Sequence, residues 1–104
     1  MRTFDHMGIP RTTPVEGEIY NEGMKVYLTD YSKSKNRVEW LRFDNDSWMP
    51  KLIQERTHIA YKVDNIDEEL NGAKILLEPT DCGSGNWIAF VEEEGMAIEL
   101  MWTK

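Results

Sequence analysis

The chain has 104 residues, with 19 acidic against 12 basic side chains and a formal net charge of −7. One domain, residues 1–104, is expected at this length, and the acid excess argues against nucleic acid and anionic membranes as partners, because polyanions bind to net positive surface. The lone Cys82 cannot close an intramolecular disulfide, and no apolar run approaches about 18 residues, so a soluble, cytoplasmic protein is expected.

Strands dominate the predicted secondary structure. β-branched and aromatic residues, bounded by Gly, Pro, Asn and Asp, predict six or seven strands. In chain order these cover residues 4–9, 24–30, 37–43, 58–63, 74–78, 86–92 and 96–102. The last two are separated by a short turn at Gly95 and form the clearest hairpin. A sheet is therefore expected to be the framework of the fold.

A single helix is predicted, over residues 64–73. Asp64 is placed to cap it, and three acidic residues follow at the positive end of the helix dipole. Ile66 and Leu70 give it a narrow apolar face. Residues 11–22 contain Pro14 and Gly17 without a periodic apolar pattern, so this segment is predicted to be a loop.

An internal repeat divides the chain into two halves. His6 is followed by an apolar, a small and an apolar residue, and His58 is followed by the same pattern. Glu39 and Glu99 likewise stand between apolar residues in matching contexts, in the same order along the chain. The wider spacing in the second half agrees with a helix that the first half lacks. Each half therefore supplies one His and one Glu from predicted strands.

This combination of side chains is suited to a metal ion. Side chains alternate across a sheet, so Glu39 shares a face with Leu41 and Glu99 shares one with Met101. A carboxylate among apolar neighbours is costly to bury unless it is paired or bound to a cation. Taken singly, a strand His or Glu is usually hydrogen-bonded or solvated. Their repetition in both halves favours a site with two nitrogen and two oxygen ligands for a divalent metal.

The sequence also resembles a known superfamily. FDHMGIP, THIAYKVDNIDEEL and ILLEP followed by NWIAFVEEEGMAIELMW resemble the vicinal oxygen chelate superfamily. This group includes glyoxalase I, methylmalonyl-CoA epimerase, extradiol dioxygenases and bleomycin-resistance proteins. The resemblance implies an α+β, glyoxalase-like cup of two βαβββ modules, at about 1–45 and about 56–104. The first module is abbreviated, because it has no predicted helix.

The resemblance also implies a site and an activity. His6, Glu39, His58 and Glu99 match the metal-ligand positions of the superfamily, and Zn, Ni, Co or Mn is the implied cofactor. The implied function is a metal-dependent lyase or isomerase of the glyoxalase or methylmalonyl-CoA epimerase type. It would act on a small oxygen-chelating substrate, with Glu39 or Glu99 as the catalytic base.

Two other functions stay open at this stage. A non-catalytic protein of the bleomycin-resistance type would use the same cup to bind a drug or aromatic ligand, and a structural module would fill the cup with its own side chains. Convergence of the four candidate ligands on one point would separate these possibilities. Unpaired strand edges and the missing helix favour a homodimer.

Overall fold

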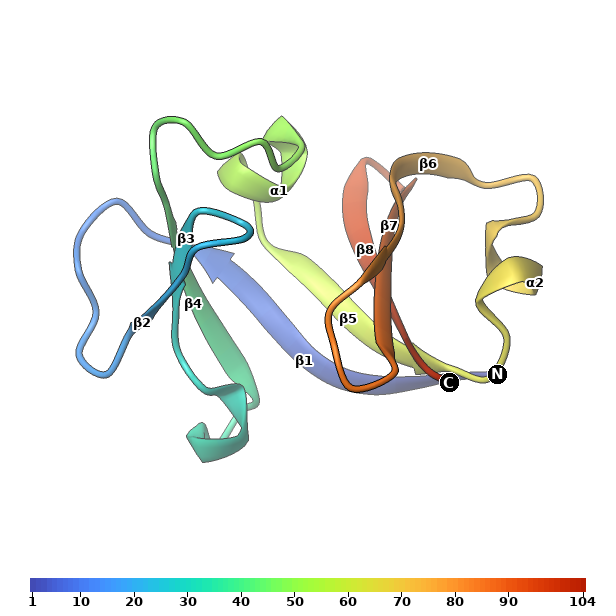
Figure 1. Ribbon diagram of the computed structural model, residues 1–104, viewed down its shortest axis with the longest axis horizontal. Coiled ribbons are helices and arrows are strands. Elements are labelled where there is room, and N and C mark those ends of the chain that lie inside the picture. Colours follow the sequence, from blue (N-terminus) through green and yellow to red (C-terminus); the bar gives the residue numbers. More distant parts are fainter.

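Eight strands form one curled, mixed sheet in the computed structural model, which describes all 104 residues (Figure 1). The strands are paired in the order β2-β3-β4-β1-β5-β8-β7-β6. Their bounds are β1 Arg2–Pro10, β2 Ile19–Asn21, β3 Val26–Leu28, β4 Val38–Phe43, β5 His58–Val63, β6 Lys74–Asp81, β7 Asn86–Glu93 and β8 Met96–Thr103. Three short helical segments join them: η1 Tyr31–Lys33, α1 Lys51–Glu55 and α2 Ile66–Leu70. None of these helices has the length and apolarity needed to cross a membrane.

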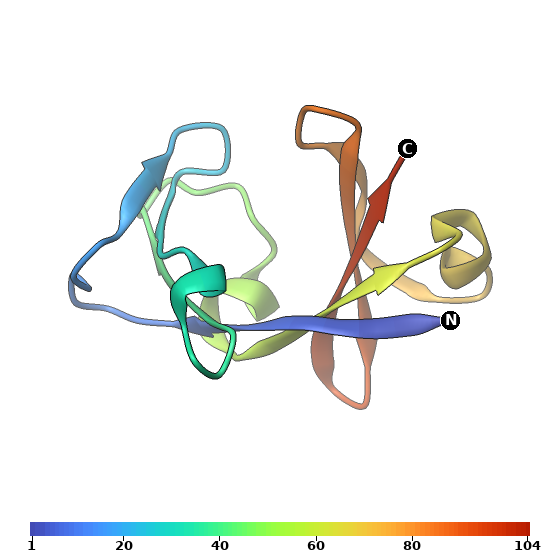
Figure 2. The ribbon, with the colours of Figure 1, turned by 90° about the horizontal axis from the view of Figure 1, so that it is seen from below.

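The expected α+β cup of two modules is confirmed. The second module runs β5-α2-β6-β7-β8, and the first runs β1-β2-β3-β4 with a loop where the second has α2. Figures 1 and 2 show the two groups of outer strands on either side of the molecule, with β1 and β5 crossing between them. The helix α1 lies between the modules in sequence, and Figure 1 shows it between the two groups of outer strands.

The pairing of the four middle strands repeats between the halves. β1 and β5 are antiparallel to each other, while β1 pairs in parallel with β4 and β5 in parallel with β8. Gly8 is opposite Glu39, and Ala60 is opposite Glu99. Gly8 and Ala60 each lie two residues after a repeat histidine. The internal repeat of the sequence is therefore also a repeat of sheet register.

Several predicted boundaries need correction. The strand predicted at 24–30 is confined to β3, and β6 does not end before Pro79 but continues to Asp81. β6 is an outer strand, and a proline without an N–H is tolerated there. The strand β2 and the helix α1 were not predicted, because both are too short for a periodic apolar pattern to show.

The predicted helix at 64–73 is shorter than expected and has a different cap. α2 covers Ile66–Leu70 only, and the Asn65 side chain accepts a hydrogen bond from the Glu68 N–H at 3.1 Å. Asn65, and not Asp64, is thus the N-cap. The Asp64 side chain instead pairs with the N-terminal amine at 3.7 Å, on the surface.

Side chains of β7 and β8 enter two different apolar clusters, because successive residues point to opposite faces. Ala89, Val91, Ile98 and Leu100 belong to the cluster beneath α2. Phe90 and Ala97 belong to the cluster on the other face, together with residues of α1 and the segment before it. Glu99 lies between Ile98 and Leu100 in sequence, so its side chain is on the Phe90 face. That face forms the inside of the cup.

Gly8 is the position at which the register leaves no room for a side chain. A Cβ at this residue would lie 2.6 Å from Nε2 and 2.8 Å from Nδ1 of His58. We expect Gly8→Ala to destabilise the protein by about 1–3 kcal/mol, because the buried imidazole must shift. Urea unfolding measures this, with Gly23→Ala as the control, since the nearest atom there is 3.5 Å away. Equal stability of the two variants would contradict the close packing.

Candidate metal centre

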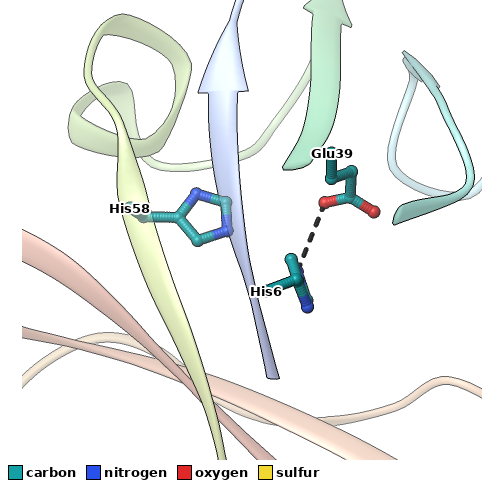
Figure 3. Close-up of side chains that lie close together, drawn as sticks. All are labelled: His6, Glu39 and His58. Atoms are coloured by element: carbon teal, nitrogen blue, oxygen red, sulfur yellow. Dashed lines mark ion pairs between the residues drawn. The ribbon is translucent and has the colours of Figure 1, made fainter. Parts of the chain in front are cut away.

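The four residues singled out by the sequence repeat line one cavity of about 220 Å³. They come from the four middle strands: His6 from β1, Glu39 from β4, His58 from β5 and Glu99 from β8. His6, Glu39 and His58 each offer a ligand atom within 4.8 Å of the others (Figure 3). Glu99 Oε1 lies 3.0 Å from His58 Nε2 and 3.6 Å from His6 Nε2. The structure thus brings all four together.

The sheet register explains this convergence. Across the central pair, His6 is opposite Ala60 and His58 is opposite Gly8, so the two histidines sit diagonally with small residues between them. The parallel partners then place Glu39 in the row of Gly8 and His58, and Glu99 in the neighbouring row of Ala60 and His6. Both histidines are almost fully buried, with 2% and 1% of their surfaces exposed.

Three contacts lie close to the ligand spacing around a shared metal ion. Two N or O ligands bound to one ion at about 2.1 Å lie about 3.0–3.4 Å apart in tetrahedral or octahedral arrangements. His58 Nε2 is 3.0 Å from Glu99, and His6 Nε2 is 3.5 Å from Glu39 Oε1. His6 Nε2 is also buried without a hydrogen-bond partner, which is rare and costly for a polar atom. A divalent ion between these side chains would satisfy it.

Asp5 is a site residue that the sequence analysis missed. Phe4 pairs with Tyr61 and His6 pairs with Ala60, so Asp5 is the extra residue of a β-bulge. The bulge interrupts the alternation of side chains, and neighbouring Asp5 and His6 are both buried. Asp5 Oδ2 lies 2.8 Å from His6 Nδ1, and this contact turns Nε2 of the ring toward the cavity. Carboxylates in this position orient metal-binding histidines in many proteins.

Tyr31 was also missed. It belongs to η1, and its ring stacks on His6 with 3.9 Å between centroids and 14° between planes. The Arg37 guanidinium also lies over the Tyr31 ring, 5.1 Å from its centroid. Burial raises the pKa of the Tyr31 hydroxyl to about 12, so this side chain stays neutral at ordinary pH. The only signal in the sequence was an aromatic residue in a polar turn, which is not specific.

The electrostatics of the site are those of a buried cluster with excess negative charge. Burial alone would lower the pKa of His6, but contacts with Glu39 and Glu99 outweigh it and raise the pKa to about 10. Burial would raise the pKa of Glu99, yet His58 and His6 hold it at about 2. Burial opposes ionisation of Asp5 too, but the His6 contact keeps its pKa below the usual range. Without a metal, His6 is therefore a cation among carboxylates.

The rest of the cavity is apolar. Of the 17 residues that line it, 12 are hydrophobic. Phe90 meets His58 edge to face, with 5.1 Å between ring centroids. Cys82, at the turn before β7, also lines the cavity, and burial raises the pKa of its thiol. The histidines and carboxylates that line the cavity are thus gathered on the middle strands, and most of the surrounding wall is apolar.

Comparison with known proteins identifies the fold. No protein-family model and no curated protein matches the chain. Among solved structures, hypothetical protein BH1468 from Bacillus halodurans C-125 aligns over 99% of this chain and 95% of its own, with a TM-score of 0.71 and 22% identity. Methylmalonyl-CoA epimerase from Mycobacterium tuberculosis aligns over 98% and 88%, with a TM-score of 0.62 and 17% identity. The chain therefore has the vicinal oxygen chelate fold.

The raised pKa of His6 predicts how the stability of the metal-free protein depends on pH. The folded state holds the His6 proton up to a pKa of about 10, whereas the ordinary value is 6.5. The folded state thus binds more protons than the unfolded state between these values, so the free energy of unfolding falls as pH rises through this range. Urea unfolding in the presence of a chelator measures it.

A His6→Gln variant is the control for this pH dependence. The two proteins differ at this one side chain, so the difference between the two curves isolates His6. We expect the difference to shrink toward pH 10. A difference that is constant with pH would show that His6 is not a cation in the folded, metal-free protein.

Proposed function

We propose that this protein is a metal-dependent lyase or isomerase of the glyoxalase or methylmalonyl-CoA epimerase type, acting on a small substrate with a carbonyl beside a second oxygen. The observation that carries the proposal is the convergence of two imidazoles and two carboxylates on one cavity, with His6 Nε2 buried and unpartnered. The fold shared with an epimerase supports the same class of chemistry. His6, Glu39, His58 and Glu99 would hold Zn, Ni, Co or Mn.

The metal would supply Lewis-acid chemistry, since a divalent ion polarises a carbonyl oxygen and stabilises negative charge that develops on it. The protein's own contribution begins with orientation. Asp5 accepts from His6 Nδ1, and the stacked Tyr31 ring prevents the imidazole from turning. The apolar walls keep water away from the oxygens of a bound substrate, which strengthens electrostatic interactions inside the cavity.

Removal of a proton from carbon requires a base, and Glu39 and Glu99 are the only carboxylates that line the cavity. Glu99 is held by His58 at 3.0 Å and has a pKa of about 2, which suits a fixed ligand more than a base. Glu39 makes no hydrogen bond and only a longer contact of 3.5 Å with His6. We therefore assign the base to Glu39, which can move toward a substrate carbon at lower cost.

A second candidate is a binding protein of the bleomycin-resistance type. The observation that favours it is the apolar wall, with 12 hydrophobic residues among the 17 that line the cavity. Such a protein would hold an aromatic or drug-like ligand and would need no metal. The volume of about 220 Å³ argues against large ligands, because drug-sized pockets measure roughly 300–1,000 Å³.

Metal binding is the first test. The chelator-treated protein is dialysed against Zn, Ni, Co or Mn separately, and bound metal is measured by elemental analysis. We expect one equivalent per chain, and a loss of affinity of about a hundredfold or more for His58→Ala, because removing a ligand costs more than the 10–100-fold of an outer contact. Glu78→Gln, an exposed change on β6, is the control. Absence of stoichiometric metal with all four ions would contradict the enzyme proposal.

Proton exchange at carbon is the second test. The loaded protein is incubated in D₂O with a hemithioacetal of methylglyoxal or with a methylmalonyl thioester, and deuterium uptake at the carbon beside the carbonyl is followed by NMR. We expect Glu39→Gln to reduce uptake by about 10²–10⁴-fold, as removal of a general base does, and to weaken metal binding less than Glu99→Gln, because Glu39 makes only the longer contact with His6. Glu99→Gln should lose metal affinity as well.

These two variants separate the roles of the carboxylates. If Glu39→Gln exchanged deuterium as fast as the wild type, Glu39 would not be the base. If the loaded wild type exchanged with neither substrate but bound aromatic ligands, the binding-protein alternative would replace the enzyme.

A further inference from the structure

No lysine or arginine side chain lines the cavity. Its five lining residues that are not hydrophobic are His6, Asn21, Glu39, His58 and Glu99, so neither Lys nor Arg is among the 17. Asn21 contributes no charge, and its side-chain oxygen already accepts from the Met24 N–H at 2.9 Å. Enzymes that bind a carboxylate or phosphate on their substrate usually do so with Arg or Lys. The protein offers no such partner inside the cup.

The nearest cations are already engaged outside the cavity. Arg37 donates to the Asp5 main-chain oxygen at 2.8 Å and approaches its carboxylate at 3.3 Å. Lys62 lies 3.6 Å from the same carboxylate, with its side chain 67% exposed. Neither residue lines the cavity. Both neutralise Asp5, so they are not free to recognise a substrate.

The charge balance within the cup leaves nothing over for an anionic group. The carboxylates of Glu39 and Glu99 match the two charges of a divalent ion. The substrate oxygens at the metal site would be balanced by the metal. Any further charged group on the substrate would be desolvated in the cavity without a partner, and this is costly.

The volume and the apolar lining of the cavity favour a small, apolar substrate group. A volume of about 220 Å³ suits a molecule smaller than a typical drug. The lining side chains that are apolar and only partly buried, and so can be touched by a ligand, include Met24, Leu28, Ile88 and Met101. They come from both modules, so an apolar group would be enclosed from two sides.

We propose that the substrate combines an oxygen-bearing head, placed at His6, Glu39, His58 and Glu99, with a short, uncharged, apolar tail that lies against the wall formed by Leu28, Ile88 and Met101. This inference rests on the proposed function and narrows its substrate class. It predicts that the cup does not recognise a second carboxylate at the far end of the substrate.

Binding of two matched probes tests the inference. α-Ketoisocaproate and α-ketoglutarate carry the same oxo-acid head, but one tail is a branched hydrocarbon and the other ends in a carboxylate. Dissociation constants are measured by ligand-observed NMR titration, with loaded and with metal-free protein. We expect the wild type to prefer α-ketoisocaproate by about tenfold or more, because apolar contact is gained and no charge is buried.

An added cation in the wall should reverse the preference. Ile88 is partly buried and faces the cavity, so in Ile88→Lys the alkyl stem can lie on the wall while the ammonium meets the tail carboxylate. The quantity compared is the ratio of the α-ketoglutarate dissociation constant to that of α-ketoisocaproate. We expect this ratio to be at least about tenfold lower in the variant than in the wild type. Ile88→Met, which adds no charge, is the matched control and should keep the wild-type preference.

The outcomes distinguish this inference from the proposed function. Equal or tighter binding of α-ketoglutarate by the wild type, or binding of neither probe by either form, overturns the inference. Failure to load any metal, with the preference for α-ketoisocaproate preserved in the metal-free protein, overturns the metal-enzyme proposal and supports the tail selectivity. Metal loading and deuterium exchange without the preference leave the enzyme class standing and remove only the substrate assignment.

Discussion

The antiparallel pairing of β1 with β5 is the contact on which the rest of the structure depends. Its register places His58 against Gly8 and His6 against Ala60, and a side chain at Gly8 would collide with the His58 ring. A slip by one residue would turn both histidines to the opposite face, because side chains alternate along a strand. The parallel pairs β1–β4 and β5–β8 then carry the same register to the two glutamates. One alignment of backbones thereby fixes four side chains.

The same elements account for what the sequence could and could not predict. The repeat of His and Glu was visible because both modules use the same register, and identical geometry demands the same residue types at the same places. Asp5 could not be found in this way. Strict alternation puts it on the face opposite His6, and only the bulge, a tertiary feature of the pairing with β5, brings it inside. Tyr31 likewise stacks on His6, but it lies in a polar turn whose sequence has no periodic apolar pattern to predict the contact.

The abbreviated first module shows how a missing helix is compensated. In the second module, α2 covers the outer face of the sheet through a cluster that contains Ile66, Val91 and Leu100. The first module has no helix in the corresponding place, and its outer face is more open. Arg11 lies over the Trp40 ring at 4.9 Å and shields part of it. A cation on an indole is a smaller cover than a helix.

The site links protonation and metal binding through one nitrogen. In the metal-free protein, the proton on His6 supplies positive charge beside Glu99 and helps to keep that carboxylate ionised in an apolar cavity. A metal ion bound as proposed would need that nitrogen unprotonated, so it would displace the proton and bring two charges in place of one. Metal and proton would then compete directly at His6. The carboxylates that make the proton hard to remove are also the groups that would attract the ion.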